Sequence, residues 1–148
     1  MKAILGTAAL GAALVLGMTA PAVQPAQAAV LCPGGYYLAQ VGGSGEVGCA
    51  TPRGGNGVIF LGIKVKGEPA GAKQPSHIHR GKCGSNGPVV IPLKDVVNGM
   101  SSTTIPMAKW KTVNHGGFYI NIHESADNIP HVVSCANITA MGMMKSSM

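Results

Sequence analysis

The chain has little that favours contact with nucleic acid, with a lipid bilayer or with zinc through cysteine. Aromatic residues make up 4% of the chain and charged residues 11%, and the basic residues are scattered, so nucleic-acid binding is not expected. No Cys-x-x-Cys pair is present, which disfavours a cysteine-based zinc site. No apolar run makes a good candidate for the roughly 20-residue span of a membrane helix.

The first 29 residues have the pattern of an export signal. Lys2 supplies a positive start, residues 8–17 form an apolar core, and Ala26-Gln27-Ala28 is a small-x-small cleavage site. An uncleaved anchor is the alternative. We predict a signal peptide over residues 1–29, a periplasmic or secreted protein, and no membrane attachment after cleavage. Loss of Lys2 would leave 10 of the 11 basic residues against 5 acidic ones, a charge of about +5.

The four cysteines all follow this signal and are even in number. Because exported proteins meet an oxidising environment, disulfides are expected. Four cysteines allow three pairings. The spacing favours Cys32–Cys49 as a local bond and Cys83–Cys135 as a long-range one.

Short apolar, β-branched runs separated by turns predict an all-β domain, a sandwich or barrel, with no convincing amphipathic helix. We expect an irregular Gly/Pro-rich N-terminal hairpin or extension over residues 30–57 and the β domain over residues 58–138. Residues 107–111 are either a helical turn or a loop, and 101–105 an edge strand. The expected strands within the β domain are residues 58–65, the segment around His77 and His79, 89–93, 118–123 and 131–138.

Two histidines, His77 and His79, stand two residues apart in a strand-like segment. Side chains at i and i+2 of a strand point to the same face, so both imidazoles can reach one metal ion. A third, His123, ends another predicted strand. Three histidines from two strands are a ligand set for copper or zinc. The alternative is that these histidines are incidental or core residues.

Residues 139–148 form a predicted disordered tail with four methionines, which are Met141, Met143, Met144 and Met148. Thioethers are soft ligands that suit Cu(I). The alternative is a tail without a role.

With these motifs in view, the chain resembles the copper/zinc superoxide dismutase superfamily. His77-Ile78-His79 resembles its His-Val-His copper pair, and residues 122–128 (Ile-His-Glu-Ser-Ala-Asp-Asn) resemble its Val-His-Glu-Lys-Ala-Asp-Asp segment. Residues 132–138 resemble the closing strand with its disulfide cysteine. The segments 77–90 and 119–123 are at least as similar to the chordin-type CHRD domain.

The resemblance implies a Greek-key β-sandwich or barrel of the superoxide dismutase type with copper held by His77, His79 and His123. It also implies a Cys83–Cys135 disulfide. Asp127 would accept a hydrogen bond from a ligating histidine, as metal-bound histidines usually require. Asn121, two residues before His123, is the alternative acceptor.

The chain also departs from the dismutase pattern. Residues 82–89, between the copper pair and the next strand, contain no histidine, so no zinc is expected. The arginine three residues before the closing cysteine is replaced by Val132, which leaves His131 as the nearest candidate proton donor or anion guide.

Four residues near the predicted ligands have open roles. Arg80 and Lys82 are candidates for steering an anion, or belong to a solvated face. His115 precedes a Gly-Gly pair and is either a fourth ligand or a loop residue. His131 is the other candidate for a fourth ligand.

Three functions follow. The first is an exported oxidoreductase with one copper ion per chain, which converts superoxide to dioxygen and hydrogen peroxide without zinc. The second is a protein that binds, stores or carries copper and exchanges it with a copper-donating or copper-accepting protein. The third is a structural or interaction module of the CHRD type.

Overall fold

A computed structural model describes residues 32–140 of the chain. The predicted signal peptide and the four methionines of the predicted tail lie outside the described residues.

The described residues form a 10-stranded sheet with strand order β4-β7-β8-β3-β2-β1-β10-β9-β5-β6. All its pairings are antiparallel. The predicted all-β class is confirmed. The strands are β1 (Tyr36–Gln40), β2 (Val47–Gly55), β3 (Val58–Lys66), β4 (Lys73–Gln74), β5 (Ser76–Arg80), β6 (Val89–Pro92), β7 (Val96–Val97), β8 (Met100–Pro106), β9 (Phe118–His123) and β10 (Val132–Ile138).

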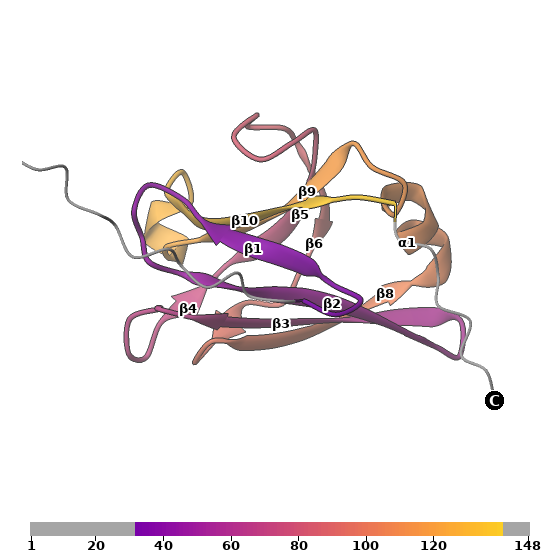
Figure 1. The fold of residues 1–148 in the computed structure, drawn as a ribbon, viewed down its shortest axis with the longest axis horizontal. Coiled ribbons are helices and arrows are strands. Elements are labelled where there is room, and N and C mark those ends of the chain that lie inside the picture. The colour runs from indigo at the N-terminus through magenta and orange to yellow at the C-terminus, as the bar shows by residue number, and fades with distance from the viewer. Residues whose placement is uncertain (1–31, 141–148) are drawn as a thin grey trace, which may run out of the picture.

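The sheet curls into two layers that meet at β1 (Figure 1). Residues 36–38 of β1 pair with β2, whereas residues 39–40 pair with β10. We call β2, β3, β8, β7 and β4 the first layer, and β10, β9, β5 and β6 the second layer. β1 is therefore shared by both layers.

The core lies between the two layers and follows from alternation along the strands. In β3, Ile59, Leu61, Ile63 and Val65 are buried and alternate with side chains that are more exposed. The second layer contributes Ile78, Ile120 and Ile122, all fully buried. Each such aliphatic side chain stabilises the fold by about 1.5–3 kcal/mol.

One end of the sandwich is covered by a short helix, α1 (Met107–Val113). Trp110 and Val113 are its buried residues, and the Trp110 ring lies 6.4 Å from that of Tyr36, centroid to centroid. The Tyr36 hydroxyl donates to Asn114 Oδ1 at 2.7 Å. Residues 107–111 are thus helical. Within residues 32–140, no helix has the length and apolar character needed to cross a membrane.

The N-terminal segment forms the expected hairpin, with β1 paired with β2, but it is a regular part of the sheet rather than an irregular extension. β2 pairs with β3 along all of its 9 residues, and β1 joins the two layers. Its Gly- and Pro-rich composition hid a regular alternation that buries Tyr36, Leu38 and Ala50. Residues 101–105 lie in β8, where each is paired with β3, whereas β7 pairs only with Met100; this part of β8 therefore has one strand partner, as expected of an edge strand. Both favoured disulfides, Cys32–Cys49 and Cys83–Cys135, are present.

A buried polar cluster links the two layers. Glu46 is 1% exposed and accepts hydrogen bonds at 2.7 Å from Gln74 Nε2 of β4 and from Ser134 Oγ of β10. Because β4 and β10 belong to different layers, this carboxyl group connects them across the interior.

Candidate metal centre

The structure brings His77, His79 and His123 together. β5 and β9 are neighbours, with His77 opposite Asn121 and Ser76 opposite Ile122. One nitrogen from each of the three rings lies within 4.8 Å of the other two. Because Ile78 and Ile122 point into the core, alternation places the histidines on the outer side of the second layer.

Hydrogen bonds to two main-chain carbonyls determine which ring nitrogens of His79 and His123 remain free to bind a metal ion. His79 Nδ1 lies 2.8 Å from the Gly87 carbonyl oxygen, and His123 Nδ1 lies 2.5 Å from that of Ile129. A carbonyl only accepts, so each neutral ring carries its proton on Nδ1 and leaves a lone pair on Nε2. His79 Nε2, His123 Nε2 and His77 Nδ1 are buried and have no hydrogen-bond partner among the described residues. These three atoms are the available ligands.

The electrostatic environment favours the neutral form of His77 and of His123. Burial lowers the pKa of His77, and the neighbouring His79 lowers it further, against a smaller opposing effect of Asp95. Burial also lowers the pKa of His123, more than its hydrogen bond to Ile129 raises it. Neutral imidazole is the form that binds a metal ion.

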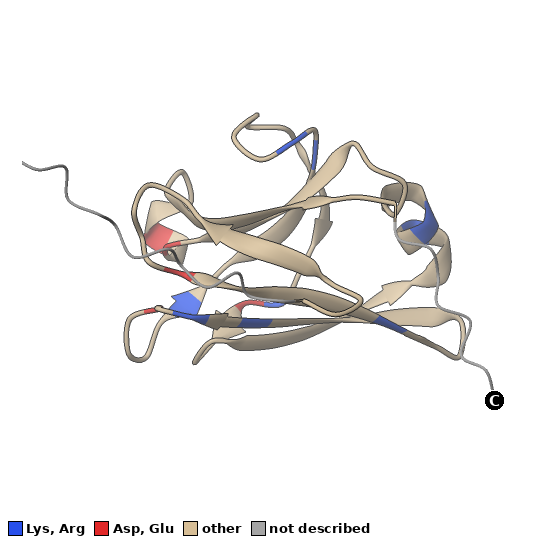
Figure 2. Ribbon diagram, in the orientation of Figure 1, with Lys and Arg blue, Asp and Glu red and all other residues tan. Residues whose placement is uncertain are grey.

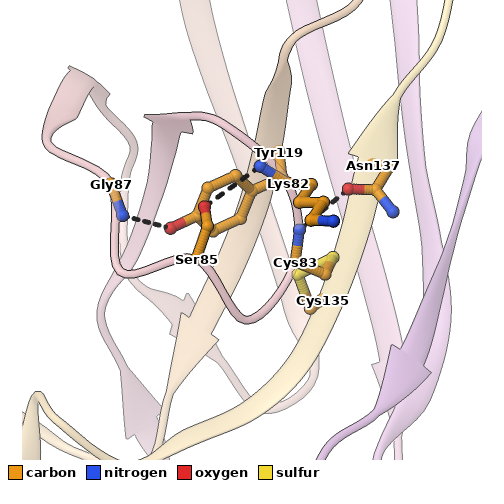
Figure 3. The surroundings of a disulfide bond; sticks show 7 residues. All are labelled: Lys82, Cys83, Ser85, Gly87, Tyr119, Cys135 and Asn137. Atoms are coloured by element: carbon orange, nitrogen blue, oxygen red, sulfur yellow. Dashed lines mark hydrogen bonds between the residues drawn. A yellow bond between two sulfur atoms is a disulfide. The ribbon is translucent and has the colours of Figure 1, made fainter.

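The loop at residues 81–88 covers His79 and is held by several contacts (Figure 3). The Cys83–Cys135 disulfide joins it to β10, and Cys83 N–H donates to Asn137 Oδ1 at 2.8 Å. Further along, Gly87 N–H donates to the Tyr119 hydroxyl at 2.9 Å. A side chain at Gly87 would collide with the Arg80 carbonyl oxygen. The Gly87 carbonyl is therefore held in place opposite His79.

The predicted hydrogen-bond acceptors lie in different settings. Asp127 is exposed in the 3-10 helix η1 (Ala126–Asn128). The Ile129 carbonyl, rather than Asp127, accepts the hydrogen bond from His123 Nδ1. Asn121 is 6% exposed, lies opposite His77, and its Oδ1 has no partner among the described residues. It belongs to the histidine face but bonds to none of the three rings.

The two candidate fourth ligands lie apart from the cluster. His131 is exposed, and its Nδ1 is 3.3 Å from Glu124 Oε2. His115 is exposed between α1 and β9, with its ring centroid 6.2 Å from that of Phe118. Within the part of the chain that the structure describes, the group of side chains that could hold a metal ion contains only His77, His79 and His123.

The two candidate anion guides differ from each other. Arg80 directly follows His79, so its side chain leaves β5 on the opposite side, and its guanidinium lies 5.5 Å from the Phe118 ring centroid. Arg80 therefore does not flank the histidines. Lys82 is exposed on the loop that covers His79.

Three residues that position the cluster were not identified from the sequence. Gly87 and Ile129 act through their carbonyl groups, which leave no side-chain signal. Tyr119 does carry a signal, because it shares the alternation of Asn121 and His123 and so must lie on the same face of β9.

Fold and site together define a two-layer antiparallel β domain with three convergent histidines on the outside of one layer. The model of the CHRD domain matches residues 37–128, which is more than half of the chain and includes all three histidines. The chain belongs to the CHRD domain family. Searches of curated proteins and of solved structures each find no significant match. These comparisons do not support the resemblance to superoxide dismutase.

The two disulfides and the family assignment both bear on the cellular location of the protein. Disulfides form and persist mainly outside the reducing cytosol. Together with the CHRD domain, Cys32–Cys49 and Cys83–Cys135 indicate an extracellular or exported protein.

Proposed function

We propose that this CHRD domain is a copper-binding module that holds one copper ion per chain through His77 Nδ1, His79 Nε2 and His123 Nε2. The observation that carries the proposal is the convergence of three buried ring nitrogens without partners. Leaving a buried polar atom unsatisfied costs about 1–3 kcal/mol. Three such atoms side by side are poorly explained by a purely structural role, whereas one cation would satisfy all of them.

The donor set favours copper over other metals. Imidazole nitrogens suit copper, zinc and nickel, and among divalent ions Cu²⁺ binds such sites most tightly. No carboxylate or thiolate belongs to the group within the described residues. Copper would supply one-electron chemistry, and the chain would supply three neutral nitrogens with fixed orientation. We expect no separate zinc site.

Copper titration of the EDTA-treated protein tests this proposal. We expect one equivalent of copper to bind. His77→Ala, His79→Ala and His123→Ala should each weaken binding by at least about 100-fold, more than a typical loss of a ligand-orienting contact. His115→Ala and His131→Ala are matched controls, because both side chains are exposed and outside the cluster. Equal copper affinity across all five variants would refute the site.

Dismutation of superoxide is a second candidate function, supported by the partial exposure of His77, which leaves one side of the cluster open to a small anion. Two superoxide ions and two protons would yield dioxygen and hydrogen peroxide. This candidate function also assumes the Greek-key strand arrangement of the dismutase type. The β5–β9 and β1–β10 pairings are compatible with that arrangement. Because Arg80 faces away and Val132 replaces the arginine of that pattern, we expect slow turnover.

An activity assay separates the enzyme from a copper carrier. Copper-loaded protein should exceed an equal amount of aqueous copper in superoxide consumption, and the activity should fall with ionic strength as steering by Lys82 is screened. A carrier would instead favour Cu(I) and release it to a partner protein. Activity no greater than that of aqueous copper would refute the dismutase function and would be compatible with a copper-binding module alone.

A further inference from the structure

We propose that a second site, distinct from the histidine cluster, binds a small organic carboxylate with a hydrocarbon body. The site is a cavity of about 510 Å³ at the α1 end of the sandwich. Strands β5, β6 and β9, helix α1 and the turn after it all contribute to its wall. The lining residues on which the argument rests are Arg80, Lys109, Thr112, Val113, His115 and Phe118.

The cavity lies on the other side of the second layer from the histidines. Arg80 is paired with Phe118 across β5 and β9, and both lie two residues from the core residues Ile78 and Ile120, on the same face of the layer. His77 and His79 occupy the opposite face of the same strand β5. The cavity is therefore not an extension of the metal centre.

The charged side chains that line the cavity are all cations. Arg80 and Lys109 form no ion pair with any acidic side chain of the described residues, and no acidic residue lines the cavity. Figure 2 shows no Asp or Glu on α1, which carries two of the lysines. The Arg80 guanidinium is placed by the face of the Phe118 ring, 5.5 Å from its centroid. This arrangement favours an anion.

The turn after α1 forms another part of the same wall. Gly116 and Gly117 have positive φ angles of 97° and 75°, a conformation that favours glycine. Both residues line the cavity. Among the described residues, neither of their N–H groups has a hydrogen-bond partner. A planar carboxylate, which accepts from a guanidinium and from main-chain N–H groups, matches these donors.

The remaining wall is apolar. Val113 and Phe118 are buried, and Val90 and Ile91 of β6 complete this side. The volume falls within the range of about 300–1,000 Å³ that is usual for small-molecule sites. A wall that combines two cations with apolar side chains fits a carboxylate that carries an aryl or alkyl group, rather than an inorganic anion.

Titration with 4-phenylbutyrate, followed by amide chemical shifts, tests this inference. We expect saturable binding that shifts residues around the cavity and is weaker by about tenfold or more for the neutral 4-phenylbutyramide, since hydrogen bonds to charged groups are the stronger ones. Equal binding of acid and amide, or no saturable binding of the acid, would overturn the proposal.

Charge-removing variants test which residues bind the carboxylate. Arg80→Gln and Lys109→Gln should each weaken binding by about tenfold. Lys111→Gln is the matched control, because Lys111 is exposed on the same helix but does not line the cavity. An equal effect of Lys111→Gln would show that only overall charge matters and would refute the site. His77→Ala should leave carboxylate binding intact, so this test stands apart from that of the copper site.

Discussion

The ring of His79 is stacked on the ring of Tyr119, with centroids 5.1 Å apart and planes inclined by 17°. The hydroxyl of the same tyrosine accepts a hydrogen bond from Gly87 N–H, and the carbonyl of Gly87 lies 2.8 Å from His79 Nδ1. Tyr119 thus supports both the imidazole ring and the group to which that ring is hydrogen-bonded. It is a positioning residue for the proposed copper site.

Tyr119→Phe keeps the stacked ring and removes the hydroxyl. The Gly87 N–H loses its acceptor, so we expect the free energy of unfolding to fall by about 1 kcal/mol. Copper affinity should drop by about tenfold, as for other contacts that orient a ligand. Tyr37→Phe is the control, because that side chain is 40% exposed on the same β-sheet. Unchanged copper affinity in Tyr119→Phe would show that the orientation of the His79 ring does not depend on this hydroxyl.

The two disulfides should contribute differently to stability and to copper binding. Their sequence separations of 52 and 17 residues correspond to roughly 4 kcal/mol for Cys83–Cys135 and roughly 3 kcal/mol for Cys32–Cys49 in the chain-entropy model. Replacing each pair by serine and measuring urea unfolding checks these values. Only loss of Cys83–Cys135 should also weaken copper binding, because only that bond holds the loop over His79. Equal losses of affinity in both variants would contradict this.

The stability of the metal-free protein should depend on pH through the histidine cluster. Burial holds the pKa values of His77 and His123 below the usual 6.5. The unfolded chain therefore takes up protons first as the pH falls, so the free energy of unfolding decreases below about pH 6.5. It should be fully restored above that value. Urea midpoints measured on either side of this pH, with EDTA present, test the prediction.

A matched variant identifies the groups responsible for this pH dependence. His77→Gln combined with His123→Gln should flatten it between the two pH values, whereas His131→Gln should not. An unaltered pH dependence in the double variant would assign the effect to other groups.

Glu46 should be among the least replaceable side chains of the interior. Glu46→Ala leaves the Gln74 amide and the Ser134 hydroxyl without an acceptor, and we expect a loss of about 3 kcal/mol in urea unfolding. Glu46→Gln should cost less because one oxygen remains. Exposed Glu124→Ala, the control, should change stability by about 0.5 kcal/mol or less. A similarly small effect of Glu46→Ala would mean that water replaces the lost acceptor.

Much of the second layer could be predicted because its pattern is local. Alternation placed His77 and His79 on one face of β5, and apolar, β-branched residues marked β9 as a strand. The same alternation places Arg80 on the face opposite His79, so its orientation away from the cluster also followed from the sequence. The hypothesis that Arg80 guides an anion to the histidines did not take this alternation into account.

Other parts of the site depend on geometry that no side-chain pattern carries. The partners of His79 and His123 are carbonyl groups, which every residue possesses. A register shift between Val132 and Ser134 interrupts β10, so alternation counted back from Cys135 does not place His131. The central position of β1 and β2 was hidden because glycines such as Gly48, where a side chain would meet the Lys64 carbonyl, lower the apparent strand propensity.

The sharing of β1 between two layers has a consequence for how the chain acquires its fold. Ala39 and Gln40 find their partners in β10, close to the end of the described chain. Contacts between such distant segments form slowly. A polypeptide that emerges from a translocation channel N-terminus first can complete the β1–β10 pairing only after Ser134 and Cys135 have appeared. The domain therefore remains unfinished until β10 has emerged, and Cys83 can meet Cys135 only at that stage.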